Sequence, residues 1–365
     1  MRCLNVINRR AALVLAGGKA CRFQTLHQPV WQDKALVLLE GKPLLVWVIG
    51  NVVDIVDEVV VCVNTEERKV RYLEILEKHS LNDVKVIVDE KTKINGPNVA
   101  ILSGLNIAQA DFCMVIPCDM PFVKPEVINY LFEMATRGFD VVVPMWPNGV
   151  LETLIMVLKR TIGLEIVRTL CQLKRDRPSD IPRAAAKTLL ISPLKTINKL
   201  DPTLKSFINI NTQEDLTKLQ TRNLQGVIQQ NITLNRGHFL ISDLQLLCDA
   251  VKKYQKDNFL EAKEKIDLSH SRFESCGNFF WAALASESKG KILLKHHHQQ
   301  QLQKNEKDSN SNYQTVFAFD FEYKKVFSNA ASNYYHEAEL YKKHQCTRLL
   351  ERAIADNHNM LTLIT

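Results

Sequence analysis

The sequence lacks the patterns that define several common classes of protein. Its nine cysteines form neither a CxxC pair nor a zinc-finger spacing, and several lie within apolar runs. We therefore expect reduced, buried thiols. No run approaches the roughly 20 apolar residues of a membrane helix. The apolar stretch after Arg9 and Arg10 is too short for a secretion signal, and basic residues follow it at once. We expect a soluble cytoplasmic protein with no membrane segment.

Charge and size restrict the partners and the architecture only broadly. The formal net charge is +7 over 365 residues, which suits anionic small ligands as well as nucleic acid. The basic residues are dispersed and form no platform with aromatic residues, so we expect no nucleic-acid partner. With 46% hydrophobic residues, the chain is long enough for two domains.

Short apolar runs alternate with helix-like segments over the first three fifths of the chain. The runs are rich in valine and isoleucine and predict strands at 11–16, 58–64, 84–89, 112–119, 139–144 and 206–211. Apolar residues at helical spacing predict helices at 44–56, 66–80, 97–110, 124–138 and 161–175. This alternation predicts an α/β fold with a doubly wound, mostly parallel sheet.

The second part of the sequence has the pattern of a separate helical domain. Long amphipathic helices are predicted at 244–266 and 331–354, so we divide the chain into domains 1–222 and 223–365. A polar, low-complexity stretch at about 295–314 predicts a disordered linker with solvated histidines. The helices weakly resemble a tetratricopeptide pair, which would make them a site for a protein partner.

The stretch VLAGGKACRF, at the end of the first predicted strand, is typical of a phosphate-binding turn. Ligands of open α/β sheets bind at the carboxyl ends of the strands. Gly17 and Gly18 allow backbone N–H groups to approach a phosphate, and Lys19 and Arg22 add positive charge. Lys34 is a further candidate cation. The turn is neither a GxGxxG nor a Walker motif, and a simple tight turn remains the alternative.

Two later strand ends carry polar residues that suit the same site. Asp119, in PCDMPF, can provide a carboxylate for Mg²⁺ or cap the next segment. In FININTQEDL, Thr212 and Asp215 form a pattern close to a capping box. Capping does not explain Asn209 and Asn211.

Seven motifs in order carry a family resemblance: VLAGGKACRF, DKALVLLEGKPLL, VCVN, VIVDE, GPNVAILSGL, PCDMPF and FININTQEDL. With them, residues 11–220 resemble the nucleotidyltransferase domain of molybdenum cofactor guanylyltransferases, the MobA-like family. The resemblance implies a nucleotide-binding set with Mg²⁺ at Asp119. Its members are Leu15, Ala16, Gly17, Gly18, Lys34, Asn64, Asp89 and Asp119. From the residues alone, Asn64 and Asp89 could equally cap turns.

The reaction that the resemblance implies is transfer of GMP from GTP to the terminal phosphate of molybdenum-loaded molybdopterin, with release of pyrophosphate. The implied catalytic residues are Arg22, Lys34 and Asp119. The acceptor phosphate is already an anion, so positioning and charge neutralisation would do most of the catalysis.

Two departures from the family keep other functions open. Arg22 and Lys34 are twelve positions apart, a spacing closer to that of sugar-phosphate nucleotidyltransferases. Thr153 precedes Leu154 where the family tends to have a proline, and the neighbouring Glu152 either meets the acceptor or is solvated. The alternatives are another phosphorylated acceptor, such as adenosylcobinamide phosphate or a sugar phosphate, and a catalytically inactive nucleotide-binding scaffold.

Overall fold

A computed structural model of the chain divides it into two compact units, Met1–Leu234 and Asn235–Thr365. The structure describes residues 8–18, 33–92, 94–212, 214–216, 230–256, 258–305 and 313–364. The domain boundary predicted after residue 222 falls within 217–229, outside the described residues, so it stays a prediction.

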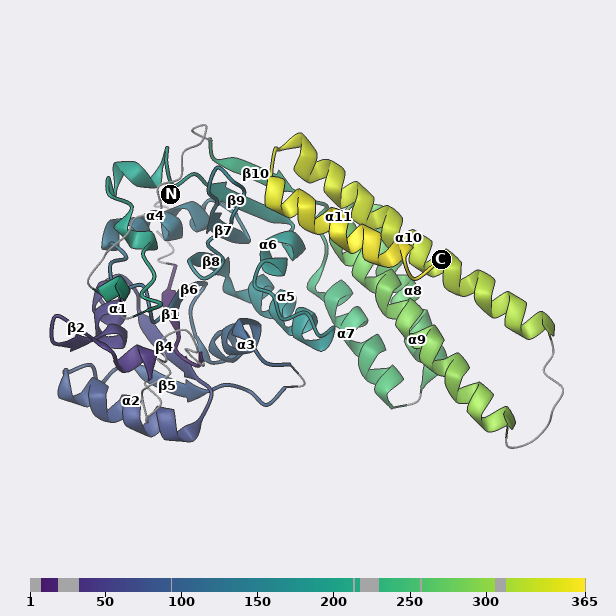
Figure 1. Cartoon of the computed structure of the whole chain (residues 1–365), viewed down its shortest axis with the longest axis horizontal. Helices are drawn as coiled ribbons and strands as arrows, with labels where there is room; N and C mark the ends of the chain where they lie inside the picture. The colour runs from purple at the N-terminus through teal and green to yellow at the C-terminus, as the bar shows by residue number, and fades with distance from the viewer. Residues whose placement is uncertain are drawn as a thin grey trace, which may run out of the picture. The chain divides into compact units, whose positions relative to one another are not determined.

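The first unit is built on an eight-stranded, mostly parallel sheet (Figure 1). Its strands are β1 (Arg10–Leu15), β4 (Glu58–Val63), β5 (Lys85–Val88), β6 (Phe112–Pro117), β7 (Val141–Pro144), β8 (Met156–Lys159), β9 (Lys187–Ile191) and β10 (Ile232–Asn235). Their order is β10-β9-β7-β8-β6-β1-β4-β5. Strand β8 pairs antiparallel with both β6 and β7. A small antiparallel pair consists of β2 (Leu38–Leu39) and β3 (Lys42–Pro43). The predicted α/β fold class is confirmed.

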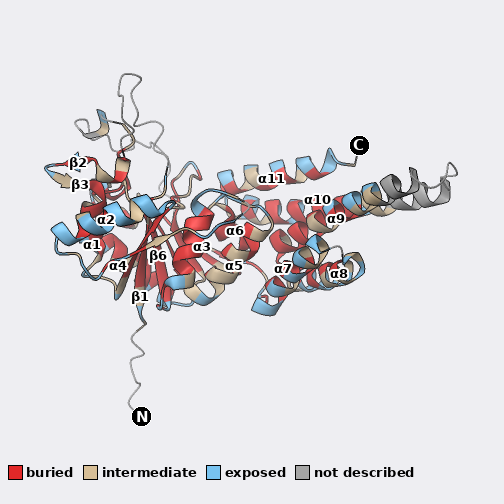
Figure 2. Cartoon of the chain, turned by 90° about the horizontal axis from the view of Figure 1, so that it is seen from below, coloured by how far each residue is buried: buried red, intermediate tan, exposed pale blue. Residues whose placement is uncertain are grey.

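Helices cover both faces of this sheet. Successive side chains of β1 point to opposite faces and therefore pack against different helices. The helices are α1 (Leu44–Val52), α2 (Glu66–Lys78), α3 (Pro97–Ile107), α4 (Pro125–Thr136), α5 (Arg160–Gln172) and α6 (Asp180–Ala184). Ala12 and Val14 belong to one core cluster with residues of α1, α2 and α4. The intervening Leu13 faces α3, where Gly104 permits close packing. The strands are buried almost throughout (Figure 2).

The predicted helices of this unit are confirmed, whereas the last predicted strand is wrong. Residues 206–211 form no ladder; a short 3-10 helix, Lys205–Phe207, precedes an irregular segment. In that segment, the Ile210 N–H donates to the carbonyl of Asp119, two residues after β6, at 2.9 Å. Strands β8, β9 and β10 were not predicted from the sequence, because they are short and their pairing depends on distant strands.

The second unit consists of helices in its described part. They are α7 (Ile241–Gln255), α8 (Phe259–Cys276), α9 (Phe279–Asn305), α10 (Tyr313–Lys343) and α11 (Thr347–Leu361). Each of the two long predicted helices is broken: Asn258 caps the start of α8, and Gln345 takes a left-handed φ of 55° before α11. Within the predicted linker, residues 295–305 continue α9 and residues 313–314 begin α10, so the prediction is wrong for them, while residues 306–312 lie outside the described residues.

No helix in the described ranges is both long and apolar enough to cross a membrane. The resemblance of the second unit to tetratricopeptide helices stays a prediction.

Candidate active site

The site lies where four neighbouring strands of the sheet end. Because β1, β4, β5 and β6 are parallel to one another, their carboxyl ends share one edge. The ladder continues one residue further, since the Asp89 N–H donates to the carbonyl of Val63 at 2.7 Å. Likewise, the Cys118 N–H donates to the carbonyl of Leu15 at 3.1 Å. The residues after the strands are thereby held at this edge.

A cavity of about 950 Å³ opens at this edge. Its lining includes every predicted nucleotide-binding residue: Leu15, Ala16, Gly17, Gly18, Lys34, Asn64, Asp89 and Asp119. Asn211 also lines it, whereas the predicted catalytic Arg22 and the neighbouring Lys19 lie outside the described residues. The volume is within the range of small-molecule sites, so the predicted residues meet at one ligand-sized cavity. Their individual roles stay predictions.

Lys34 and Asp119 form an ion pair in this cavity. The Lys34 ammonium donates to Asp119 Oδ2 at 2.5 Å and to Asn211 Oδ1 at 2.9 Å. The two side chains are 13% and 20% exposed, so solvent screens the pair only partly. Lys34 therefore reaches the edge of the sheet, although it is far along the sequence from Gly17 and Gly18, which we call the glycine turn.

The second carboxylate oxygen of Asp119 suits a cation. Asp119 Oδ1 is buried and has no hydrogen-bond partner within the described part of the chain. A buried charged oxygen without a partner is costly, and a divalent cation would compensate it. No group of three or more His, Cys, Asp or Glu side chains that could hold a metal occurs among the described residues. The donor set therefore fits Mg²⁺ bound through one carboxylate plus substrate oxygens, the usual arrangement for this ion.

Asp89 lies under the glycine turn. A Cβ added to Gly17 would be 3.3 Å from both the Asn64 nitrogen and Asp89 Oδ2, so a residue without a side chain is favoured here. Burial raises the pKa of the Asp89 carboxyl to about 6. Its Oδ1 is buried and has no partner in the described ranges. This carboxylate is available to accept hydrogen bonds from a ligand.

The segment 207–216 divides its polar residues between structure and site. The Asp215 carboxylate accepts from the backbone of Asn211 at 2.7 Å and of Thr212 at 2.8 Å, and Thr212 Oγ1 accepts the Asp215 N–H at 3.3 Å. These bonds confirm the predicted capping pattern. Asn211 bonds Lys34, whereas Asn209 is absent from the described lining of the cavity.

On the expected acceptor side, Glu152 has a structural role. Its side chain accepts the indole N–H of Trp146 at 2.6 Å, and the residue is only 8% exposed. Glu152 is thus not solvated, nor does it appear in the described cavity lining, while Leu154 does.

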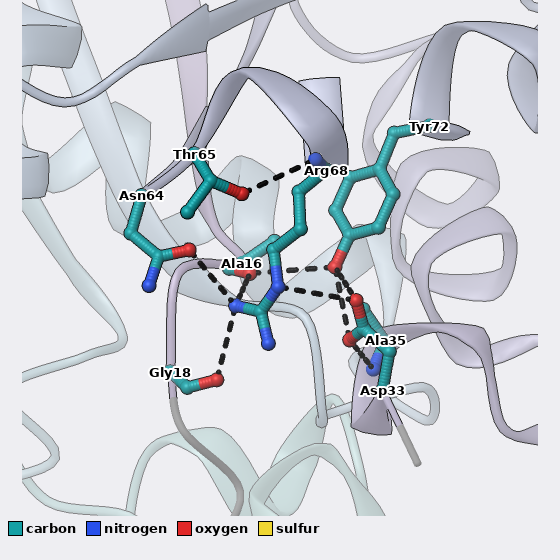
Figure 3. A network of polar contacts seen from close by, with 8 residues as sticks. All are labelled: Ala16, Gly18, Asp33, Ala35, Asn64, Thr65, Arg68 and Tyr72. Carbon is teal, nitrogen blue, oxygen red and sulfur yellow. Dashed lines mark hydrogen bonds and ion pairs between the residues drawn. The ribbon is translucent and has the colours of Figure 1, made fainter. Parts of the chain in front are cut away.

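Three further residues, in or beside the lining of the cavity, were not predicted from the sequence. Asp33, Arg68 and Tyr72 form a polar network behind the glycine turn (Figure 3). Arg68 and Tyr72 are four residues apart and therefore share one face of α2. This spacing was the only signal in the sequence, because their partner Asp33 comes from a distant segment.

The fold and the cavity together are typical of an α/β nucleotide-binding domain. A glycine turn, a lysine and two carboxylates meet at the carboxyl edge of a mostly parallel sheet, where such ligands bind.

Comparisons with known proteins agree with this class. Residues 12–186 match the model of the MobA-like NTP transferase domain. A probable molybdenum cofactor guanylyltransferase of Methanosarcina acetivorans is 34% identical over 58% of this chain and 89% of its own length. That of Methanosarcina mazei is 31% identical over the same shares. The chain therefore belongs to the MobA-like NTP transferase family, whose members are nucleotidyltransferases.

Solved structures are similar at lower identity. One of them is 4-diphosphocytidyl-2C-methyl-D-erythritol synthase from Anaerococcus prevotii, which is 13% identical with a TM-score of 0.41. The match covers 57% of this chain and 95% of that one.

Proposed function

We propose that the chain transfers GMP from GTP to the terminal phosphate of molybdenum-loaded molybdopterin and releases pyrophosphate. The observation that carries the proposal is the convergence of Lys34, Asp119 and the Gly17–Gly18 turn on one cavity. The named relatives support guanine as the base and molybdopterin as the acceptor.

In the proposed reaction, an oxygen of the acceptor phosphate attacks the α-phosphorus of GTP. The bond from the α-phosphorus to the bridging oxygen breaks, and its electron pair leaves with pyrophosphate. The attacking oxygen is already an anion, so no side chain has to remove a proton. The residues that matter are those that orient the triphosphate and balance its charge.

Lys34 and the glycine turn would stabilise the departing pyrophosphate. The Lys34 ammonium can exchange its contact with Asp119 for the phosphate oxygens, while the turn offers backbone N–H donors. Asp119 would hold Mg²⁺, which when bound would neutralise part of the charge of the reacting phosphates. We propose that Arg22 adds a further positive charge.

Asp89 provides a physical reason for the site to prefer guanine over the other bases. The guanine edge presents two adjacent donors, N1–H and N2–H, which a carboxylate can accept together. Asp89 lines the cavity beside Asn64 and has a buried oxygen without a partner among the described residues. Adenine and cytosine lack this pair of donors, so the ionised Asp89 would favour GTP.

Pyrophosphate release from the purified full-length chain tests the proposal. Each of the four nucleoside triphosphates is combined with molybdenum-loaded molybdopterin, adenosylcobinamide phosphate or a sugar phosphate, in the presence of Mg²⁺. Release with GTP and molybdenum-loaded molybdopterin is expected. If pyrophosphate is released only with another combination of nucleoside triphosphate and acceptor, that combination defines the function in place of the proposed one.

Two variants distinguish an enzyme from an inactive scaffold. Asp119→Asn removes the carboxylate at the cavity, while Asp83→Asn changes an exposed loop aspartate and serves as the matched control. Loss of turnover in the first variant alone is expected. Equal GTP–Mg²⁺ binding by wild type and Asp119→Asn, with no turnover by either, would favour a nucleotide-binding scaffold.

We place this activity in the cytoplasm, with GTP and a phosphorylated small molecule as partners. The role of helices α7–α11 in binding another protein is a separate prediction.

A further inference from the structure

Arg68 makes an unusual number of contacts behind the glycine turn. Its Nη1 donates to the carbonyl of Gly18 at 3.1 Å, to that of Ala16 at 3.3 Å, and to Asn64 Oδ1 at 3.2 Å. Its Nε lies 3.2 Å from Asp33 Oδ2 (Figure 3). One side chain thus contacts the turn, the residue after β4 and the residue before Lys34.

Tyr72 reinforces the same contacts. Its hydroxyl lies 3.0 Å from each carboxylate oxygen of Asp33 and 3.4 Å from the carbonyl of Ala16. The ring is fully buried, and burial raises the pKa of the Tyr72 hydroxyl, which therefore stays protonated as a donor. Neither Arg68 nor Tyr72 is among the described residues that line the cavity, whereas the residues they hold are.

Holding the carbonyl of Ala16 also fixes the direction of a backbone donor. In a planar trans peptide, the C=O and the following N–H point in opposite directions. With the Ala16 carbonyl turned toward Arg68, the Gly17 N–H points away from it. In the described part of the chain, the N–H groups of Gly17 and Gly18 donate to no acceptor. Both glycines line the cavity, so these donors are available to an anion there.

Arg68 also supports the segment that carries Lys34, through its ion pair with Asp33. The Asp33 carboxylate accepts the N–H of Ala35 at 3.2 Å and thereby caps the 3-10 helix Lys34–Leu36. Asp33 is only 9% exposed, so its charge depends on Arg68 for compensation. Arg68 therefore holds the base of the segment from which the Lys34 ammonium enters the cavity.

We propose that Arg68 is a positioning residue for the triphosphate: it aligns the glycine-turn donors and the Lys34 segment without touching the ligand. The inference rests on the proposed function only in requiring that the chain binds a nucleoside triphosphate. A lysine at this position could pair with Asp33, but its single ammonium group lacks the fork of donors that reaches four partners at once.

Binding of GTP–Mg²⁺ and of guanosine to the full chain tests this inference by calorimetry. For Arg68→Lys we expect the Kd of GTP to rise about tenfold, which is about 1.4 kcal/mol, and that of guanosine less than twofold. The control Arg71→Lys lies on the same helix but is exposed, and should bind both ligands as wild type does. A general loss of structure would instead weaken both ligands equally and lower the Tm.

Other results of these binding measurements would overturn the inference or the proposed function. Unchanged GTP affinity in Arg68→Lys, or an equal loss for GTP and guanosine, overturns the inference. If Arg68→Lys does not fold, Tyr72→Phe decides: an increase of about threefold in the Kd of GTP alone supports the inference, and no change overturns it. A wild-type chain that binds no nucleoside triphosphate overturns the proposed function itself, which separates the two failures.

Discussion

Replacing Asp89 by asparagine should remove a pH dependence from GTP binding. Burial raises the pKa of this carboxyl from 3.8 to about 6, so it gains a proton within an accessible pH range. Only the ionised carboxylate can accept both guanine donors. The affinity of the wild-type chain for GTP should therefore fall as the pH falls below about 6.

The size of the effect follows from this pKa. At pH 5, one unit below it, about one tenth of the carboxyl groups are ionised, so the affinity should be about tenfold lower than at pH 8, or about 1.4 kcal/mol. The Asp89→Asn amide has one acceptor and a competing NH₂ donor. This variant should bind GTP at least tenfold more weakly than wild type at pH 8, and this difference should shrink as the pH falls through about 6.

The same shift affects stability in the absence of ligand. A raised carboxyl pKa means that the folded protein disfavours the charged form. The protonated Asp89 carboxyl contributes fully to the stability of the folded state below the ordinary pKa of 3.8. This contribution is lost as the pH rises through about 6. Asp89→Asn should consequently be more stable than wild type above pH 6, by about 1 kcal/mol after allowing for the partial exposure of the group.

Two assays follow these changes. The Kd of GTP–Mg²⁺ is measured from pH 5 to pH 8 for both chains, and their ratio cancels the titration of the triphosphate itself. Urea denaturation at pH 4 and pH 7.5 gives the stability difference, with Asp83→Asn as an exposed control. A ratio of the two Kd values that stays constant across pH 6 would refute the assignment of base recognition to this carboxylate.

Three further substitutions test the site and its support. Gly17→Ala would place a methyl group 3.3 Å from the Asn64 backbone nitrogen and should weaken GTP binding several-fold by calorimetry; unchanged affinity would contradict the close approach. Asp119→Asn removes the partner of Lys34 and should lower pyrophosphate release at least a hundredfold; an unchanged metal titration would place the cation elsewhere. Gly104→Ala puts a methyl group 3.0 Å from a leucine of β1 and should cost about 1–3 kcal/mol of unfolding free energy; an unchanged urea midpoint would show that the core can adjust.

Local pattern was sufficient to predict much of the first unit. Continuous apolar runs identified β1, β4, β5 and β6, since buried parallel strands need apolar residues on both faces. The residues that follow these strands were thereby assigned to one edge. Asp119 could be selected as a site residue because parallel strands all end on the same side, whereas Leu15, Asn64 and Asp89 were selected through the family resemblance.

Only the tertiary structure decided how the remaining groups meet. The antiparallel insertion of β8, the irregular path of residues 206–211 and the ion pair of Lys34 with Asp119 each depend on segments far apart in the chain. Arg68 is the clearest example, since only Asn64 among its partners is near it in sequence, whereas Gly18 and Asp33 come from distant segments. Hydrophobic periodicity records which residues are buried, but hydrogen bonds and charge pairs depend on distances that the fold alone establishes.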